Sequence, residues 1–273
     1  MKLQGRVALI TGGAGHIGVA MADALAELGC TLCLLDCQGE ALAQGANRLR
    51  NNWGVRVETL KVDLENEQER AAVPHALGTL FGRLDILINN AGFVGDSQLQ
   101  GWGVALEDQR VDTWRRALEV NLTAVFHLSQ ILAPMLREYG KGTIVNMSSI
   151  YGVAGPDLRL YEGTTMGHPA AYAASKGGVI QLTRWLSTVL APEIRVNCIS
   201  PGGVFRNQPE VFVERYVART PLARMAAEED FKGAIAYFAS DLSAYVTGEN
   251  LMVDGGWTVW CVTQRITRTA FVC

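Results

Sequence analysis

Short hydrophobic runs alternate with longer segments of helical periodicity along most of this chain. The hydrophobic runs cover residues 6–11, 31–36, 55–63, 84–90, 142–149, 194–200 and 250–256. Helical periodicity is found between them, for example at residues 16–28, 65–81, 109–139, 170–190 and 228–240. The runs are hydrophobic along their whole length, which is typical of parallel strands covered by helices on both faces. The pattern therefore predicts a doubly wound parallel α/β sheet of the Rossmann type.

The alternation continues to about residue 255 without a linker, an internal repeat or a low-complexity tract. We therefore expect a single domain over residues 1–260, followed by a C-terminal tail of unknown role at residues 261–273. A chain of 273 residues is long enough for one large core. In such sheets ligands bind beyond the carboxyl ends of the strands, so functional side chains should follow the hydrophobic runs.

Composition and charge exclude several classes of protein. The formal net charge is −3, the pI is about 5.9 and no run of Lys or Arg occurs, so a nucleic-acid partner is not expected. No hydrophobic run approaches the roughly 18 to 20 residues of a membrane span. The beginning, MKLQGRVALITGG, lacks the pattern of a signal peptide. We expect a soluble cytoplasmic protein that acts on a small polar molecule.

Six cysteines raise the question of a metal or disulfide site. Cys30 and Cys33 form a C-x-x-C pattern, but the surrounding CTLCLLDC resembles a buried strand. Residues three apart on a strand point to opposite faces, so these two thiols should not share a metal ion. We expect buried, unreactive thiols and no metal site.

A glycine-rich turn follows the first hydrophobic run. In TGGAGHIG, Gly12, Gly15 and Gly18 permit a tight turn and close approach to a pyrophosphate, and the next helix directs its amino end toward the phosphates. Asp36 ends the second run, 18 residues beyond Gly18. Its carboxylate suits the ribose hydroxyls and would repel a 2′-phosphate. The sequence therefore predicts NAD as the cofactor, with NADP less favoured.

Two further strand ends fit a nucleotide site. Asp63 closes the run LKVD and is expected to lie near the adenine. The small residues of NNAG at 89–92 provide a floor beneath the cofactor, although an ordinary turn is an alternative interpretation of this segment.

Tyr172 and Lys176 lie four positions apart among small residues in AAYAASKGG, so a helix would place them on one face. A free tyrosine has a pKa of about 10 and is a poor base at neutral pH. A neighbouring ammonium group, together with a positively charged nicotinamide, would lower that pKa and favour proton transfer. An exposed Tyr–Lys pair without function is the alternative.

Seven motifs occur in the order typical of one family: TGGAGHIG, NNAG, EVNLTAVF, IVNMSSIYG, YAASK, SPGG and VDGGW. Over residues 5–257 the chain resembles the short-chain dehydrogenases/reductases of the compact single-domain kind. The resemblance implies a catalytic set of Asn121, Ser149, Tyr172 and Lys176. Tyr172 would be the acid/base, Lys176 would lower its pKa and hold the ribose, Ser149 would bind the reacting oxygen, and Asn121 would anchor a water.

The resemblance also extends the predicted cofactor site, which then comprises Gly12, Gly15, His16, Ile17, Gly18, Asp36, Asp63, Leu64, Asn90, Ala91, Gly92, Tyr172, Lys176, Pro201, Gly202 and Val204. The chain departs from the compact pattern in four places. His16 gives the glycine spacing of the extended branch, and Arg206 replaces a threonine expected to hold the carboxamide. An extra segment at 156–169 separates two catalytic residues, and the tail 261–273 passes the usual end.

The sequence limits the substrate only loosely. Candidate substrate contacts are Tyr151, Arg159, Tyr161, Glu162 and Arg206, and they favour a sugar, sugar acid or polyol. The extra segment 156–169 borders either the pocket or a subunit interface. Two other functions stay open: an epimerase or dehydratase that uses bound NAD transiently, and a non-enzymatic nucleotide-binding protein. A homo-oligomer, tetramer or dimer, is expected through the helices at 109–139 and 170–190.

Overall fold

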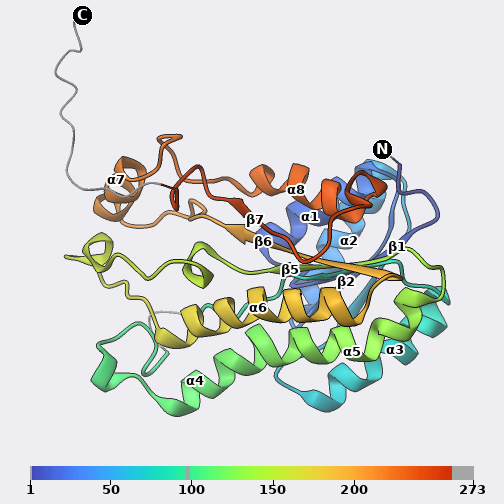
Figure 1. Ribbon diagram of the computed structural model, residues 1–273, viewed down its shortest axis with the longest axis horizontal. Coiled ribbons are helices and arrows are strands. Elements are labelled where there is room, and N and C mark those ends of the chain that lie inside the picture. Colours follow the sequence, from blue (N-terminus) through green and yellow to red (C-terminus); the bar gives the residue numbers. More distant parts are fainter. Residues whose placement is uncertain (1, 96–98, 260–273) are drawn as a thin grey trace, which may run out of the picture.

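The computed structural model describes residues 2–95 and 99–259 of the chain. Within them, seven strands form one parallel sheet in the order β3-β2-β1-β4-β5-β6-β7 (Figure 1). The strands are β1 (Val7–Thr11), β2 (Thr31–Asp36), β3 (Val57–Lys61), β4 (Ile86–Asn89), β5 (Gly142–Met147), β6 (Ile194–Pro201) and β7 (Asn250–Val253). The direction of winding reverses between β1 and β4, where this class of fold binds its ligands. The predicted single-domain Rossmann-type fold is confirmed.

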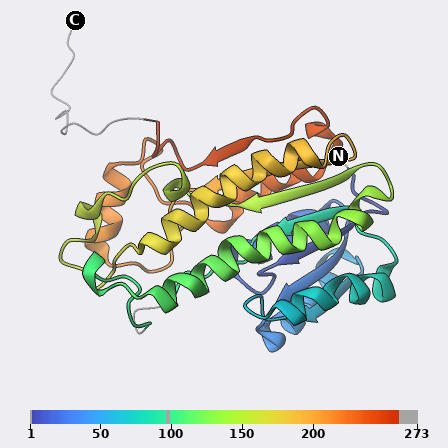
Figure 2. The ribbon, with the colours of Figure 1, turned by 60° about the horizontal axis from the view of Figure 1, so that its bottom comes forward.

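Helices cover both faces of the sheet in two layers (Figures 1 and 2). One layer contains α1 (His16–Glu27), α2 (Gly39–Trp53) and α8 (Lys232–Ala239), whose hydrophobic side chains share one core cluster with β1 and β2. The opposite layer contains α3 (Glu67–Phe81), α5 (Ala124–Arg137) and α6 (Ala170–Val189), which share a second cluster. The two remaining helices, α4 (Val111–Leu118) and α7 (Glu210–Ala218), lie toward the carboxyl ends of the strands.

The central strands are buried along their length, as the hydrophobic runs indicate, whereas the edge strands β3 and β7 are partly exposed. Cys30 and Cys33 are buried in the clusters on opposite faces of the sheet, so the predicted separation of these two thiols is confirmed. Cys198 is also buried, but Cys37 is exposed. The prediction of a buried thiol is therefore wrong for Cys37, because the chain has left the sheet after Asp36. Cys261 and Cys273 lie outside the described residues.

The predicted helix at 109–139 is divided into three parts. Between α4 and α5 the residues Glu119–Thr123 form a π-helical turn. The predicted helix at 228–240 begins with the 3-10 turn Glu228–Phe231 before α8. The helical ranges named in the sequence analysis include neither α2 nor α7. None of the helices within the described ranges has both the length and the hydrophobicity needed to cross a bilayer.

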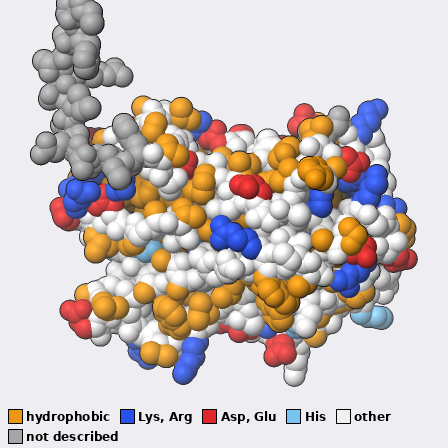
Figure 3. Space-filling model, viewed as in Figure 1, with side chains coloured by type: hydrophobic (Ala, Val, Ile, Leu, Met, Phe, Trp, Pro, Cys, Tyr) orange, Lys and Arg blue, Asp and Glu red, His pale blue; other side chains and the backbone are white. Residues whose placement is uncertain are grey.

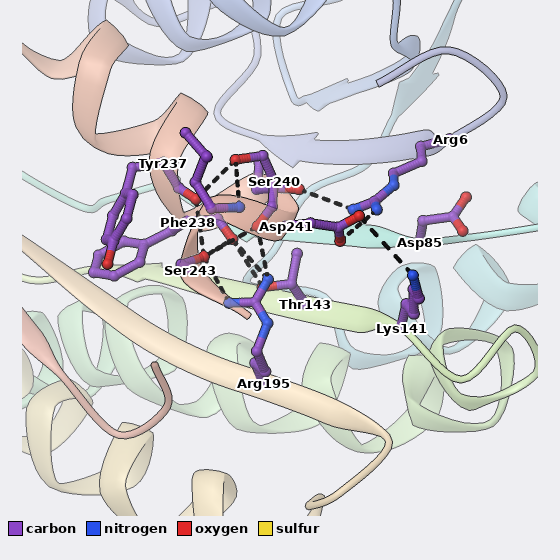
Figure 4. A network of polar contacts seen from close by, with 12 residues as sticks. Arg6, Asp85, Lys141, Thr143, Arg195, Tyr237, Phe238, Ser240, Asp241 and Ser243 are labelled. Carbon is purple, nitrogen blue, oxygen red and sulfur yellow. Dashed lines mark hydrogen bonds and ion pairs between the residues drawn. The ribbon is translucent and has the colours of Figure 1, made fainter. Parts of the chain in front are cut away.

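A polar network ties α8 to the amino ends of the strands (Figure 4). Arg195 on β6 donates to the carbonyl oxygens of Phe238 at 3.1 Å and Ser240 at 3.3 Å, and Arg6 donates to that of Ala239 at 3.3 Å. These carbonyls lie at the end of α8, and the two guanidinium groups, together with the hydroxyl of Ser243, serve as their donors. Burial lowers the pKa of Arg195 from its ordinary value. This network stabilises the fold at the amino ends of the strands, opposite the ligand-binding end of the sheet.

Candidate active site

One large cavity of about 720 Å³ opens at the carboxyl ends of the strands. Every residue predicted to bind the cofactor lines it: Gly12, Gly15, His16, Ile17, Gly18, Asp36, Asp63, Leu64, Asn90, Ala91, Gly92, Tyr172, Lys176, Pro201, Gly202 and Val204. Ser149 lines the same cavity, whereas Asn121 is fully buried behind its wall. The volume is within the range of about 300 to 1,000 Å³ typical of small-molecule sites.

The turn between β1 and α1 can be built only from glycine at its critical positions. Gly12 has a φ of +65°, a conformation that favours glycine. A Cβ atom on Gly18 would lie 2.1 Å from the carbonyl oxygen of Gly12, so the helix packs directly on the turn. No acidic residue occupies the first turn of α1. Its free N–H groups and positive dipole end therefore face the cavity as an anion site.

Thr11 holds the glycine turn against the end of β4, a contact not anticipated from the sequence. Its hydroxyl accepts from the backbone N–H groups of Asn90 at 3.0 Å and Ala91 at 3.1 Å. In return, the amide of Asn90 donates to the carbonyls of Thr11 at 3.0 Å and Gly12 at 3.2 Å. These hydrogen bonds hold the ends of β1 and β4 together at the switch point. They fix the floor of the cavity on which a nucleotide would lie.

Acidic side chains mark one end of the cavity. The Asp36 carboxylate accepts from the backbone N–H of Ala14 at 3.2 Å and of Gln38 at 3.1 Å, which holds it in place at the end of β2. Asp63 and Glu65 line the same end of the cavity. Glu65 is paired with Arg116 at 2.8 Å, so a negative charge brought here by a ligand would mainly meet the carboxylates of Asp36 and Asp63.

Lys176 is buried on α6, with 4% of its surface exposed. Its ammonium Nζ donates to the carbonyl oxygen of Met147 at the end of β5, at 2.9 Å. Burial lowers the pKa of Lys176 from 10.5 to about 8. Gly92 lies beside this ammonium group, since a Cβ there would be 3.7 Å from Nζ. Within the described part of the chain this buried cation has no anionic partner, so it is available to a ligand in the cavity.

Tyr172 lies one helical turn before Lys176, with Lys176 Nζ 5.7 Å from the centroid of its ring. Burial raises the pKa of Tyr172, while a hydrogen bond with Ser149 and the charge of Arg206 act to lower it. The ammonium group of Lys176 donates to the Met147 carbonyl, and its predicted effect on the pKa of Tyr172 stays a prediction. The geometry does bring the hydroxyl of Ser149, rather than that of Ser148, to the phenol.

Ser148 has a different partner. Its hydroxyl donates to the backbone carbonyl of Lys176 at 2.8 Å, so it joins β5 to α6. The Ser149 hydroxyl accepts from the N–H of Tyr151 at 3.2 Å and caps the short turn that follows. The two adjacent serines thus separate into one that faces the helix and one that faces the cavity, which is the alternation expected at a strand end.

Asn121 explains the π-helical turn. Its side-chain oxygen accepts from the N–H of Phe93 at 2.6 Å, and its amide donates to the Phe93 carbonyl at 3.2 Å and the Ser175 hydroxyl at 3.1 Å. The side chain therefore joins the segment after β4 to α6, the helix that carries Tyr172 and Lys176. Such single π turns are frequent at functional sites. The role of Asn121 as a water anchor stays a prediction.

The other end of the cavity is aromatic, and the extra segment 156–169 builds much of it. Tyr151 and Tyr161 join their hydroxyls at 2.9 Å, and the His168 ring lies 4.1 Å from the ring of Tyr151 and 5.8 Å from that of Tyr172, centroid to centroid. Further lining residues, not predicted from the sequence, are Phe93, Trp102, Met166, Phe212, Tyr216 and Met225. The extra segment thus borders the cavity, one of the two places expected for it.

His168 is unusual within this aromatic wall. Its Nε2 atom is buried and has no hydrogen-bond partner among the described residues. Burial lowers the pKa of His168 from 6.5 to about 4, so the ring is neutral at physiological pH. Next to it, Gly167 packs on the backbone of Gly103, where a Cβ on Gly167 would lie 2.0 Å from the carbonyl oxygen. This close packing anchors the extra segment beside α6.

Two of the predicted substrate contacts lie elsewhere. Arg159 and Glu162 are exposed and do not line the cavity. Arg159 forms a bidentate pair with Asp157 at 2.8 Å, and the backbone carbonyls of Arg159 and Glu162 accept from Arg215 of α7. Arg219, which caps the end of α7, also pairs with Asp157. The prediction for Arg159 and Glu162 is therefore wrong, because these polar groups hold the segment to α7 while its aromatic side chains face inward.

The cavity residues fit a nicotinamide dinucleotide. The glycine turn packs without side chains directly against α1 and the segment after β4, α1 presents its amino end, and Asp36 is held as an acceptor for hydroxyl groups. Lys176 offers a buried donor in the same cavity. An anion site, a hydroxyl acceptor and a buried cation in one cleft match the diphosphate and the sugars of such a cofactor.

The fold and the cavity together define an oxidoreductase of the alcohol dehydrogenase or ketone reductase type. The family model described as Enoyl-(Acyl carrier protein) reductase matches residues 12–258. The chain belongs to the short-chain dehydrogenase/reductase family, as its motifs predict.

Relatives with different substrates resemble the chain to a similar degree. The 3-oxoacyl-[acyl-carrier-protein] reductase FabG of Thermotoga maritima is 33% identical, over 95% of this chain and 100% of that protein. The trans-4-hydroxycyclohexanecarboxylate dehydrogenase of Sinomonas cyclohexanicum is 37% identical, over 93% of each chain. The solved structure of NAD+-bound xylitol dehydrogenase is 31% identical, with a TM-score of 0.84 over 94% of this chain and 100% of that one.

Proposed function

We propose that this protein is an NAD-dependent oxidoreductase that interconverts a secondary alcohol and a ketone, with Tyr172 as the acid/base. One observation carries the proposal: the Tyr172 hydroxyl meets Ser149 in the same cavity that the glycine turn and the buried Lys176 line. The acid/base group, a second donor for the reacting oxygen and the nucleotide site then act on one bound substrate.

Each side chain has a distinct task in this proposal. When bound, the nicotinamide dinucleotide supplies the two-electron acceptor or donor and, in its oxidised form, a positive charge in the cavity. Tyr172 Oη takes the hydroxyl proton of the alcohol during oxidation and returns a proton to the oxygen during reduction. The Ser149 hydroxyl donates a hydrogen bond to the same oxygen, where negative charge develops. Lys176 offers its ammonium group to the ribose hydroxyls.

The preference for NAD over NADP rests on the acidic end of the cavity. Asp36 is fixed by two backbone N–H groups, and Asp63 and Glu65 lie near it. Among the described residues, the only Lys or Arg side chains that line the cavity are Lys176 and Arg206. Glu65 is paired with Arg116 at 2.8 Å, so the repulsion of a 2′-phosphate rests mainly on Asp36 and Asp63.

A sugar, sugar acid or polyol is the proposed substrate. Aromatic side chains at the substrate end offer flat apolar faces for the C–H groups of a ring, with the paired hydroxyls of Tyr151 and Tyr161 for its polar groups. The similarity to a xylitol dehydrogenase, at 31% identity, supports a hydroxylated substrate. The similarity to a hydroxycyclohexanecarboxylate dehydrogenase, at 37% identity, supports a ring with a carboxylate.

The test uses a panel of polyols, sugar acids and cyclic hydroxy acids with NAD or NADP, followed by NADH absorbance. Tyr172→Phe should reduce turnover by about 100-fold or more, because acid–base catalysis contributes about 10² to 10⁴. Tyr245→Phe is the matched control, since Tyr245 is fully exposed. Unchanged turnover in Tyr172→Phe would refute the assignment. Substrate conversion without net NADH would favour the epimerase or dehydratase instead.

We further propose a homo-oligomer that forms through α4, α5 and α6. Figure 3 shows hydrophobic side chains gathered over this side of the molecule, and the exposed ones include Trp114, Phe126, Trp185 and Val189. Large exposed hydrophobic surfaces mark interaction sites. Sedimentation analysis of the wild type and of Phe126→Glu tests this proposal, since a charge at the interface should shift the protein toward the monomer.

A further inference from the structure

Four arginines lie in and around α7, and only one of them lines the cavity. Arg215 donates to backbone carbonyls of the extra segment, Arg219 pairs with Asp157, and Arg224 forms a bidentate pair with Asp230. Arg206, the fourth, lines the cavity wall. The first three have structural partners in the protein, so Arg206 is the arginine of this group that is available to a ligand.

The loop holds Arg206 without consuming its guanidinium group. The backbone N–H of Arg206 donates to the side-chain oxygen of Gln208 at 2.7 Å, and Gln208 donates in turn to the carbonyl of Val204 at 2.8 Å. The nearest carboxylate is that of Glu228, 3.5 Å from Arg206 Nε. This distance exceeds the roughly 2.7 to 2.9 Å of a strong charged hydrogen bond. The side chain is 39% exposed and lies at the cavity.

The surroundings strengthen the attraction of this cation for an anion. The neighbouring wall contains Phe212, Tyr216 and Met225, which screen charge poorly. The influence of Arg206 also reaches the reacting end of the cavity, since its charge acts against the rise that burial causes in the pKa of Tyr172. A guanidinium fork recognises a carboxylate through two parallel hydrogen bonds.

We propose that Arg206 binds a carboxylate of the substrate, so that the protein acts on hydroxy acids and keto acids whose carboxylate lies on a carbon other than the reacting one. The proposal rests on the function proposed above and narrows its substrate class. A sugar acid or a cyclic hydroxy acid satisfies it, whereas a neutral polyol does not. The carbon skeleton between the two groups would lie against the aromatic wall.

A phosphate of the cofactor is the other possible anion, and Glu228 argues against it. Its Oε1 atom lies 3.5 Å from His16 Nδ1 of the glycine turn and 3.5 Å from Arg206 Nε. A carboxylate therefore stands between the turn that would hold the phosphates and the guanidinium group. A phosphate that approached Arg206 from the turn would meet this negative charge.

The experiment measures binding rather than turnover. Cyclohexanecarboxylate and cyclohexanecarboxamide, which have similar shapes and differ in charge, are titrated calorimetrically into the NAD-loaded protein. Neither probe carries an alcohol or a ketone, so the result does not depend on catalysis. The variants are Arg206→Gln, Arg206→Lys and the control Arg159→Gln, which removes an arginine outside the cavity. The dissociation constant of NAD is measured for each variant.

We expect the wild type and Arg159→Gln to bind the carboxylate about 10- to 100-fold more tightly than the carboxamide, the range of one charged pair. Arg206→Gln should lose this preference and keep its affinity for NAD, and Arg206→Lys should keep part of the preference. No preference in the wild type, or weaker NAD binding in Arg206→Gln with the preference intact, would overturn the proposal. A carboxylate preference in a protein that oxidises no hydroxy acid would contradict the proposed function while leaving Arg206 as an anion site.

Discussion

We expect the buried charge of Lys176 to lower the free energy of unfolding of the cofactor-free protein. Lys176 is buried on α6, none of the residues that the structure describes gives it an anionic partner, and burial lowers its pKa from 10.5 to about 8. Below pH 8 the lysine is charged in both the folded and the unfolded chain, and the folded state bears the cost of the buried charge. Replacement by methionine, which has a similar length and no charge, should therefore stabilise the cofactor-free protein.

The magnitude follows from the two pKa values. The interval between 10.5 and about 8 corresponds to about 3 kcal/mol, at about 1.4 kcal/mol for each pH unit. Lys176→Met also loses the hydrogen bond to the Met147 carbonyl, worth about 1 kcal/mol. The net gain at pH 7 is then about 2 kcal/mol, or a rise in Tm of roughly 4 to 8 °C for a domain of this size. Turnover should fall by about 100-fold or more, because the buried cation is lost.

The pH dependence makes the test specific. Between pH 8 and 10.5 the unfolded chain holds more protons on this lysine than the folded protein does, so the wild type gains stability as the pH rises. The advantage of Lys176→Met should accordingly shrink over this interval in urea unfolding experiments. The control Lys61→Met changes an exposed lysine at the end of β3 and should follow the wild type. A Lys176→Met protein that is less stable than the wild type by the same amount at pH 7 and pH 10 would refute the reasoning.

Three further predictions concern other parts of the cavity. Asp36→Ala should weaken NAD binding by about tenfold and leave NADP binding equal or stronger, and titrations that show equal losses for both would contradict the ribose assignment. Asp157→Asn should release the extra segment from α7 and raise KM several-fold at unchanged NAD affinity, so unchanged kinetics would refute this coupling. Below pH 6.5 the unfolded chain binds a proton at His168 that the folded protein rejects down to about pH 4. His168→Leu should thus lose less stability than the wild type when thermal unfolding is followed from pH 7 to pH 4.5, and parallel losses would contradict it.

Much of the fold follows from the hydrophobic runs because the central strands are buried on both faces. Such a run admits few alternatives once helices of the right length alternate with it. The π-helical turn at Glu119–Thr123 could not be predicted in this way, because the helical periodicity passes through it unchanged. Its cause is the pairing of Asn121 with the backbone of Phe93, 28 residues away, which no local pattern records.

The site divides in the same manner. The glycine turn, Asp36 and the Tyr172–Lys176 pair occupy strand ends or one helix face, so their spacing alone places them in the cavity. The substrate end depends on how the extra segment docks. Asp157 and Arg219, 62 residues apart, fix that docking and turn Tyr161 inward. Arg159 and Glu162 therefore suggest substrate contacts when only the sequence is considered. In the structure they belong to the contacts that hold the extra segment to α7.

The contact between the extra segment and α7 has a consequence for engineering the substrate specificity of the protein. Several side chains that shape the substrate end, such as Tyr161, His168 and Phe212, come from these two pieces, whereas the groups assigned to proton transfer come from the segment after β5 and from α6. Many of the side chains that would select the substrate thus lie on segments other than those that carry the acid/base group. Moving residues 156–169 and 205–224 of this chain together onto another scaffold would keep the Asp157–Arg219 ion pair, while moving either piece alone would break it.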